Sequence, residues 1–320
     1  MINYESCLSS YFSGFATIFM LHRVSPLGEG GIQPNENMKV TPEFLEKFII
    51  DMRADGYSFI SINRLHEIIL NREIVFKQIV ITLDDGYKDN FNIAYPIFKK
   101  YDVPFTVYIT SSFPNGSAYL WWYALEDLLL KSSEIILGDG TLFPCKSYEE
   151  KLQAFFLVRK RIMSLPKVDF SIHIKNIFSK YCVDWESLCI NYCMDWSEIS
   201  EISKDEICTI GGHTINHLAL NCLPFEDIKY EVLEGNRFIE SKINKKVEHF
   251  AYPFGGRDVV GRREFDILKS FGLKTATTTR RGNIYLGHGR YLEALPRLML
   301  TDSFLKHDIW KIRKKRIVVE

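Results

Sequence analysis

Two adjacent carboxylates, Asp84 and Asp85, are the residues of this sequence whose position most strongly suggests chemistry. They follow the apolar run Gln78–Leu83, which has the length and β-branched content of a buried strand, and Gly86 comes next. Two carboxylates at the end of a buried strand are costly unless they are paired, hydrogen-bonded or bound to a metal. An Asp-Gly turn with a helix-capping carboxylate would have the same sequence, so the pair alone does not decide its own role.

Two histidines four residues apart, His213 and His217, follow another predicted strand, Ile207–Gly212. Residues at i and i+4 lie on one side of a helical turn, so both imidazoles can bind one ion. Core or capping histidines would show the same spacing. Two imidazoles and one carboxylate are nevertheless a common ligand set for a catalytic divalent metal with open coordination positions. Together with the two aspartates, the histidines predict a metal site.

Two further segments place residues suited to catalysis at the ends of predicted strands. Residues Phe250–Gly256 lead from a strand into a Pro/Gly turn, whose backbone N–H groups can face a developing oxyanion. We assign Phe254 and Tyr252 to contact with the oxyanion or the substrate. Residues Met20–Val24 end the first predicted strand, and His22 can act there as a general acid near neutral pH. Taken alone, an ordinary turn and a structural histidine would explain these two segments equally well.

The elements that must position these residues alternate along the chain, because short apolar runs are separated by helical patterns. Near-continuous apolar strands indicate a parallel sheet that is buried on both faces. Strands are predicted at Phe15–Leu21, Tyr57–Ile62, Gln78–Leu83, Phe105–Thr110, Ile207–Gly212, Val247–Tyr252, Leu273–Thr279 and Leu295–Leu300. Such alternation predicts an α/β barrel or a doubly wound sheet. In a barrel, the carboxyl ends of the strands surround the active site.

The predicted helices lie between these strands, and one long stretch interrupts the alternation. Thr41 is expected to cap a helix that has Pro42 in its first turn, and a helix over Asp89–Tyr101 is expected to bend at Pro96. Residues from about 113 to 204 are mostly helical in pattern. We therefore predict one domain over residues 1–320 with a helical insertion. Its opening aromatic residues could form a sugar platform or simply pack the insertion onto the barrel: Trp121, Trp122 and Tyr123.

The composition is that of an ordinary globular protein, with 46% hydrophobic and 25% charged residues in a chain of 320. The 40 basic and 40 acidic residues leave no basic surplus, so a nucleic-acid partner is not expected. The start of the chain lacks both a basic leader and a long apolar run, which predicts a cytoplasmic protein. The basic tail over 306–316 is expected to be a solvated segment, and a weak contact with a membrane surface is the alternative.

Together, these motifs resemble those of the polysaccharide deacetylase (NodB-homology) family of carbohydrate esterases. The family's T-F-D-D-G motif corresponds to Thr82–Gly86, and its H-[ST]-x-x-H motif is present in full at 213–217. The order and wide separation of the motifs also match, and the likeness covers most of the chain outside the insertion. The resemblance implies a distorted (β/α) barrel of about seven strands. It also implies a metal-dependent hydrolase that removes an N-acetyl group from a sugar of a polysaccharide or its cytoplasmic precursor.

The resemblance also implies a role for each residue of the metal site. In the family, the first aspartate of the motif is the general base, and the second aspartate and both histidines bind the metal. Asp84 is therefore expected to be the base, and Asp85, His213 and His217 are expected to bind a divalent metal. Zn²⁺ is the expected ion, although other transition metals suit the same donors.

The third family motif, R-x-P-[FY]-G, is only partly kept. Pro253, Phe254 and Gly255 match it, but Ala251 stands where an arginine that holds the catalytic aspartate is expected. We expect Arg297 to take the place of this arginine.

The family's C-terminal L-x-H segment, which carries the acid, is missing, because Leu298–Leu300 contains no histidine. A subgroup of the family has its catalytic histidine in an N-terminal Y-H-x-[VI] segment. Residues Leu21–Val24 resemble that segment, with Leu21 in place of tyrosine, and this implies that His22 is the general acid.

Three other functions use some of the same residues. The chain could be another amide or ester deacylase of the same fold. A non-haem iron oxygenase also binds its metal through two histidines and a carboxylate, but its usual His-x-Asp start is absent here. A catalytically inactive relative that binds carbohydrate is favoured by the missing arginine at position 251 and opposed by the intact base and ligands.

Overall fold

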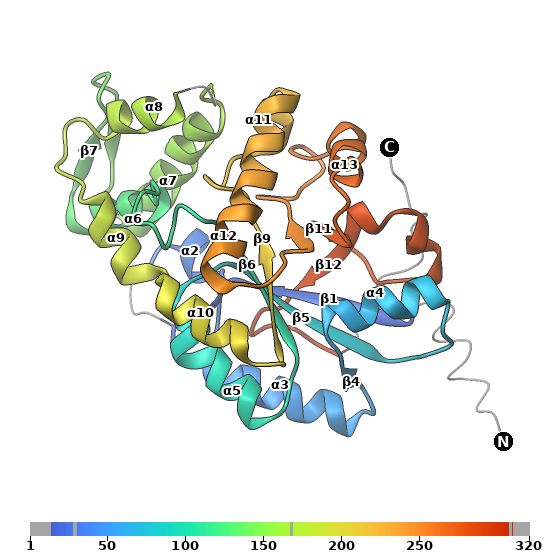
Figure 1. The fold of residues 1–320 in the computed structure, drawn as a ribbon. Coiled ribbons are helices and arrows are strands. Elements are labelled where there is room, and N and C mark those ends of the chain that lie inside the picture. The colour runs from blue at the N-terminus through green and yellow to red at the C-terminus, as the bar shows by residue number, and fades with distance from the viewer. Residues whose placement is uncertain (1–13, 28–30, 167–168, 307–308, 310–320) are drawn as a thin grey trace.

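A closed barrel of seven parallel strands forms the centre of the protein (Figure 1). The computed structural model describes residues 14–27, 31–166, 169–306 and 309. Around the ring, the strands are β1 (Ala16–Leu21), β12 (Leu295–Met299), β11 (Thr275–Arg281), β10 (His249–Ala251), β9 (Cys208–Gly212), β6 (Phe105–Ile109) and β5 (Gln78–Asp85). The ring closes because β1 pairs with both β12 and β5. The distorted barrel of about seven strands, which the family resemblance implied, is confirmed, and the doubly wound sheet that the alternating pattern also allowed is excluded.

The side chains of β5 show how the strands divide between the two faces of the barrel wall. Ile79, Ile81 and Leu83 belong to the hydrophobic cluster under the surrounding helices. Successive side chains of a strand point to opposite faces, so Thr82 and Asp84 point into the barrel interior. Both contact the same arginine there. The period of two therefore places the first aspartate of the motif inside the barrel.

The segment predicted as a strand over residues 57–62 is an exception. Only β4 (Ser58–Phe59) forms there, and it pairs with the first residues of β5 outside the closed ring. Ser61 ends this strand because its side chain accepts a hydrogen bond from the Arg64 N–H and caps helix α4 (Ile62–Asn71). The prediction of a full strand here was wrong, since the cap starts a helix within the predicted range.

Helices pack around the barrel, and two of them can be compared with the predictions. The Thr41 cap is confirmed, because its side chain accepts from the Phe44 N–H at the start of α3 (Pro42–Ala54). The helix expected to bend at Pro96 instead contains a π-helical turn (Asn90–Ala94), which precedes α5 (Tyr95–Lys100). The others are α10 (Trp196–Lys204), α11 (Phe225–Lys229), α12 (Gly235–Ile243) and α13 (Arg262–Ser270), with a second π-helical turn (Tyr230–Glu234) joining α11 to α12.

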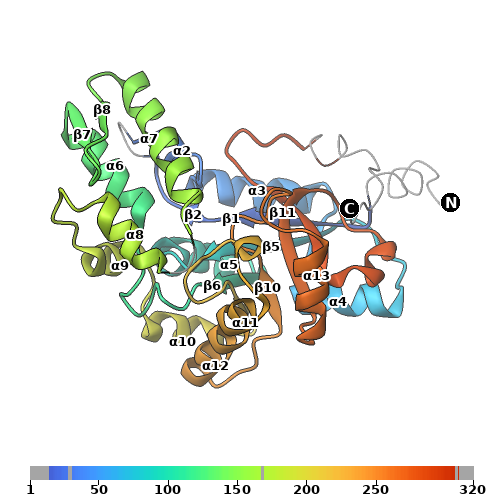
Figure 2. The ribbon, with the colours of Figure 1, turned by 90° about the horizontal axis from the view of Figure 1, so that it is seen from above.

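The predicted insertion forms a lobe beside the barrel (Figures 1 and 2). It contains α6 (Trp121–Lys131), α7 (Tyr148–Met163), α8 (Phe170–Ile177), α9 (Trp185–Tyr192) and a hairpin of β7 (Glu134–Ile136) and β8 (Leu142–Pro144). These helices share a hydrophobic cluster of their own, which includes Leu125, Phe155 and Ile174. Helix α10 differs, because its Ile199 and Ile202 belong to the core of the barrel. The lobe therefore ends before α10.

Three short elements and three 3₁₀ turns complete the described chain. The elements are β2 (Arg23–Val24), β3 (Lys39–Val40) and α2 (Gln33–Glu36), and the turns cover Leu220–Cys222, Leu286–Arg290 and Leu292–Ala294. The parallel pair of β2 and β3 directly follows the end of β1. It therefore fixes the path of the chain just beyond His22.

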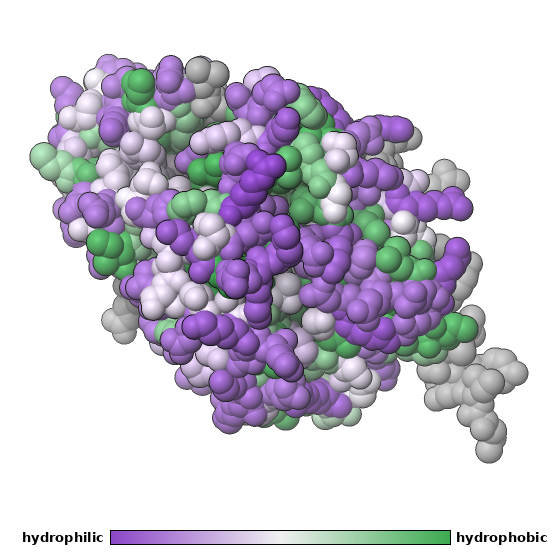
Figure 3. All heavy atoms as spheres, in the orientation of Figure 1, coloured by the Kyte–Doolittle hydropathy of each residue, from purple (hydrophilic) through white to green (hydrophobic). Residues whose placement is uncertain are grey.

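The surface drawn in Figure 3 is mainly hydrophilic, with small hydrophobic patches between charged side chains. Within the described ranges, no helix has the length and apolar character needed to cross a membrane. Most of the basic tail, including Trp310, lies outside the described residues, and so does its predicted contact with a membrane surface. The cytoplasmic location stays a prediction.

Candidate active site

Except for Tyr252, the structure brings together the predicted site residues from five strands of the barrel. Asp84 and Asp85 end β5, and the other residues lie on β1, β9, β10 and β12 or directly follow them. Side chains at the carboxyl ends of parallel strands meet at one opening of a barrel. The sequence motifs, although far apart along the chain, therefore form one site.

Asp85, His213 and His217 form a group whose possible ligand atoms all lie within 4.8 Å of one another. The Nε2 atoms of both histidines are 3.3 Å from Asp85 Oδ1. Neither contact meets the geometry of a hydrogen bond, so this buried carboxylate oxygen has two histidines beside it but no hydrogen-bond partner among the described residues. Burial alone would raise the pKa of Asp85, but the two histidines hold it well below its usual range. Two nitrogens and one oxygen that converge in this way fit a divalent metal ion.

The orientation of His213 is set by its other ring nitrogen. Its Nδ1 lies 2.7 Å from the carbonyl oxygen of Ala251, so Nδ1–H donates this bond and Nε2 keeps its lone pair for the metal position. The hydroxyl of Thr110 donates to the carbonyl oxygen of His213 and holds its backbone. The last residue of β10 therefore orients the ring of His213, a proposed metal ligand that directly follows the neighbouring strand β9.

The backbone is strained at four non-glycine positions of the site. Asp85, Thr214, His217 and Phe254 have φ values of 77°, 66°, 55° and 62°, in the left-handed region. Gly86, whose φ is +79°, continues this sharp turn, and a Cβ atom there would lie 2.8 Å from Ile109. Non-glycine residues in this region are costly and cluster at functional sites. The strain indicates that the positions of these side chains are set by the surrounding fold.

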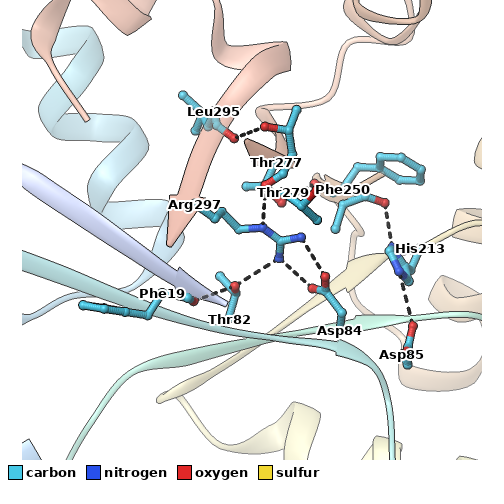
Figure 4. A network of polar contacts seen from close by, with 12 residues as sticks. Phe19, Thr82, Asp84, Asp85, His213, Phe250, Thr277, Thr279, Leu295 and Arg297 are labelled. Carbon is cyan, nitrogen blue, oxygen red and sulfur yellow. Dashed lines mark hydrogen bonds and ion pairs between the residues drawn. The ribbon is translucent and has the colours of Figure 1, made fainter. Parts of the chain in front are cut away.

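Arg297 reaches from β12 across the barrel interior to Asp84 (Figure 4). Its Nη1 and Nη2 donate to Oδ1 and Oδ2 of Asp84, both at 2.6 Å. It also donates to the Thr82 hydroxyl and the carbonyl oxygen of Thr278. Both charged side chains are almost fully buried, at 0% and 2% exposure. Burial would raise the pKa of Asp84, but the guanidinium outweighs it and the pKa is lowered, so the carboxylate is ionised near neutral pH.

His22 lies beside the two aspartates and is buried. The side chain of Asn90 donates to the His22 carbonyl oxygen at 2.9 Å and fixes the backbone at this point. Its Nδ1 has no hydrogen-bond partner among the described residues. Burial lowers the pKa of His22, although Asp84 and Asp85 oppose this effect. The imidazole is therefore mainly neutral at pH 7.

Of the two residues assigned to the oxyanion or substrate, only Phe254 faces the site. Its ring centre lies 4.7 Å from that of His217, and the hydrogen bonds of the described chain leave its N–H free. Tyr252 is directed elsewhere: its hydroxyl donates to the carbonyl oxygen of Glu293, and its N–H donates to that of Thr277. The assignment of Tyr252 is therefore corrected, because both of its donors are used within the core.

Glu231 is a residue of the site that the sequence did not indicate. It lies in the π-helical turn between α11 and α12 and is 5% exposed. Its Oε2 accepts from the backbone N–H groups of Ile215 and Asn216, both at 2.9 Å, and Oε1 accepts from the Asn216 side chain. This carboxylate thereby holds the loop between the two histidines. No sequence signal distinguishes it from the other acidic residues of a long amphipathic helix.

A cavity of about 300 Å³ lies between the lobe and the barrel, next to His217. Trp122 of α6 lines it, and the centres of the Trp122 and His217 rings are 5.8 Å apart. The lining contains further aromatic side chains from both parts of the chain: Phe113, Tyr119, Trp121, Phe170, Tyr230 and Phe254. The aromatic start of the insertion therefore contributes to the wall of a cavity at the metal group.

A family model described as polysaccharide deacetylase matches residues 72–136 and 140–276, which together are more than half of the chain. The chain belongs to the polysaccharide deacetylase family. The predicted enzyme class, a sugar N-deacetylase, is confirmed at the level of this family. The matched ranges contain Asp84, Asp85 and both histidines, whereas His22 and Arg297 lie outside them.

Solved structures of several deacetylases share the fold of this family member. The Streptococcus pyogenes deacetylase PplD in complex with acetate has a TM-score of 0.61 and 16% identity, over 94% of this chain and 98% of that chain. IcaB from Ammonifex degensii has a TM-score of 0.59 and 15% identity, over 93% and 94%. BC0361, a polysaccharide deacetylase from Bacillus cereus, has a TM-score of 0.56 and 19% identity, over 90% and 66%. A search of curated proteins gives no significant match.

Proposed function

We propose that this protein is a metal-dependent hydrolase that removes the acetyl group from an N-acetylated sugar. The ligand group of Asp85, His213 and His217 carries the proposal, together with membership of the deacetylase family. Two imidazole nitrogens and one carboxylate oxygen would hold a divalent ion such as Zn²⁺ and would leave coordination positions open for water and substrate.

Each residue has a defined part in this hydrolysis. The bound metal would polarise the acetyl carbonyl and make its water ligand more acidic. Asp84 takes a proton from the attacking water, and the ion pair with Arg297 holds both of its oxygens in place. The free N–H of Phe254 donates to the oxyanion of the tetrahedral intermediate. His22, in its protonated form, donates a proton to the departing sugar amine, in the manner of the subgroup with an N-terminal histidine.

The alternatives from the sequence are now less favourable. The inactive, carbohydrate-binding alternative depended on the missing arginine at position 251. Arg297 supplies a guanidinium to Asp84 from a different strand, so this reason no longer applies. Membership of the deacetylase family argues against an iron oxygenase.

The test is acetate release from an N-acetylglucosamine oligomer by protein that has been stripped with a chelator and reloaded with Zn²⁺. Asp84→Asn should lower turnover by about 10²- to 10⁴-fold, the usual range for a general base, while the bound zinc stays the same. Asp139→Asn, at an exposed aspartate of the lobe, is the matched control and should leave turnover unchanged. Full activity in Asp84→Asn would refute the role of the base, and release that a chelator does not affect would refute metal dependence.

A further inference from the structure

The cavity beside His217 has a wall with an unusual charge balance. Three carboxylates line it, those of Asp169, Asp227 and Glu231, and no lysine or arginine of the described chain does so. Two cations contact lining residues without belonging to the lining: the Nζ of Lys175 lies 5.8 Å from the centre of the Tyr119 ring, and Nη2 of Arg263 donates to the carbonyl oxygen of Leu223. The wall is therefore acidic where a ligand would lie.

The three carboxylates differ in their exposure and in the hydrogen bonds that they already accept. Glu231 already accepts three hydrogen bonds from the loop that carries His217. Asp169 at the start of α8 and Asp227 in the first turn of α11 are both exposed. A ligand in the cavity would thus meet one carboxylate from the lobe and one from the barrel.

Two other features of the wall indicate a polar ligand with flat apolar faces. The Oγ atom of Ser112 is buried and has no hydrogen-bond partner in the described chain, although Ser112 belongs to the lining. Such an orphaned hydroxyl is unusual in a folded protein. Trp122 and Phe254 are only partly buried, and both rings lie next to that of His217 in the cavity lining. Sugar rings combine hydroxyl groups with apolar C–H faces, and this matches both features.

On the basis of the function proposed above, we propose that this cavity binds the sugar unit next to the reacting one. It selects among substrates by the charge of that neighbouring unit. It favours chains whose neighbouring units are neutral or carry a free, protonated amine, and it rejects sugars linked directly to phosphate. A phosphate or pyrophosphate group in this cavity would face the carboxylates of Asp169 and Asp227, and no lysine or arginine among the described lining residues would pair with it, whereas an ammonium group would be attracted to these carboxylates. Among the glycan chains on which this family acts, the preferred substrate is therefore one whose unit in this cavity already carries a free amine.

The experiment compares three probes on zinc-loaded protein by kcat/KM for acetate release. The probes are the N-acetylglucosamine disaccharide, the same disaccharide with a free amine on the non-reacting unit, and UDP-N-acetylglucosamine. The wild-type protein should prefer the amine-bearing probe to the neutral one and turn over the phosphate-linked one least. Asp227→Asn should lower the amine-to-neutral ratio and raise the phosphate-to-neutral ratio, each by about two- to fivefold, the range of exposed charge pairs. Added salt should reduce both changes, because it screens exposed charges.

Glu226→Gln is the matched control. Glu226 is the neighbouring exposed acidic residue of α11, but it is not part of the cavity wall, so its replacement should leave both ratios unchanged. Equal ratios in Asp227→Asn and the wild type, or a wild-type preference for the phosphate-linked sugar, would overturn the proposal.

If no probe releases acetate, the proposed function fails, and calorimetry then tests charge selection separately. The fully deacetylated disaccharide should bind the wild type more tightly than Asp227→Asn, and equal binding would overturn the proposal.

Discussion

Replacing Arg297 by Met should destabilise the protein strongly, because it leaves the Asp84 carboxylate buried without its partner. Methionine retains an apolar stem of similar length, but it removes four hydrogen bonds, two of them to Asp84 at 2.6 Å. Both partners are almost inaccessible to solvent, so water screens their attraction very little. The variant therefore measures the cost of an unpaired charge in the barrel interior.

The expected loss of unfolding free energy is about 3–5 kcal/mol, the usual cost of removing one partner of a buried ion pair. Coulomb's law gives a similar value, about 4 kcal/mol for unit charges about 4 Å apart at an effective dielectric constant of about 20. The loss should also depend on pH. The ion pair lowers the pKa of Asp84, so its contribution is present above the pKa of the unfolded chain and is lost as pH falls through the folded value. The difference between variant and wild type should shrink in acid.

Urea unfolding at pH 7 and at several pH values below 3.8, the ordinary pKa of an aspartate, measures both effects, with the m-value as the check on comparable transitions. Arg161→Met is the matched control, because Arg161 pairs with Asp139 at 2.5 Å but the two side chains are 39% and 46% exposed. It should cost under about 1 kcal/mol. The double variant Asp84→Asn/Arg297→Met should lose less unfolding free energy than the two single variants lose together. The difference should be at least about 2 kcal/mol. A loss under about 1 kcal/mol in Arg297→Met, or strict additivity, would refute the reasoning.

Three further predictions concern the metal and the acid. The wild-type protein should bind one zinc ion per chain, and His217→Gln should weaken binding by at least about 100-fold in a competition assay with a chelating dye; unchanged affinity would remove His217 from the ligand set. Glu231→Leu should weaken zinc binding by about 10- to 100-fold, because the loop between the histidines loses the carboxylate that holds it. Glu231→Gln keeps an acceptor oxygen and should weaken zinc binding less. Equal zinc affinities in both variants and the wild type would contradict this positioning role. Finally, kcat/KM should fall as pH rises through the pKa of His22, which burial places below 6.5, because only the protonated imidazole donates. A pH profile of His22→Gln should lack this fall, and a profile identical to that of the wild type would exclude His22 as the acid.

The corrections made by the structure have specific physical causes. Tyr252 belongs to the predicted strand-end segment and directly follows β10, but the sequence does not decide whether its hydroxyl points into the site or into the core. The fold directs it to Glu293, 41 positions along the chain. The strand predicted at 57–62 failed because Ser61 caps a helix, a local signal that lay inside a run with strand composition.

The sequence by itself determined the α/β class and predicted the three residues that converge in the structure as a possible metal site. Both depend on short-range patterns: apolar runs followed by Asp84-Asp85, and two histidines four residues apart. The tertiary structure alone decided how Asp84 is held and what surrounds His217. Arg297 is 213 positions from Asp84, and its side chain points inward only because β12 pairs with β1 and β11 in one register. A shift of one residue would reverse its direction, and no local pattern specifies that register. The acidic, aromatic cavity likewise exists only because the lobe lies beside the opening of the barrel.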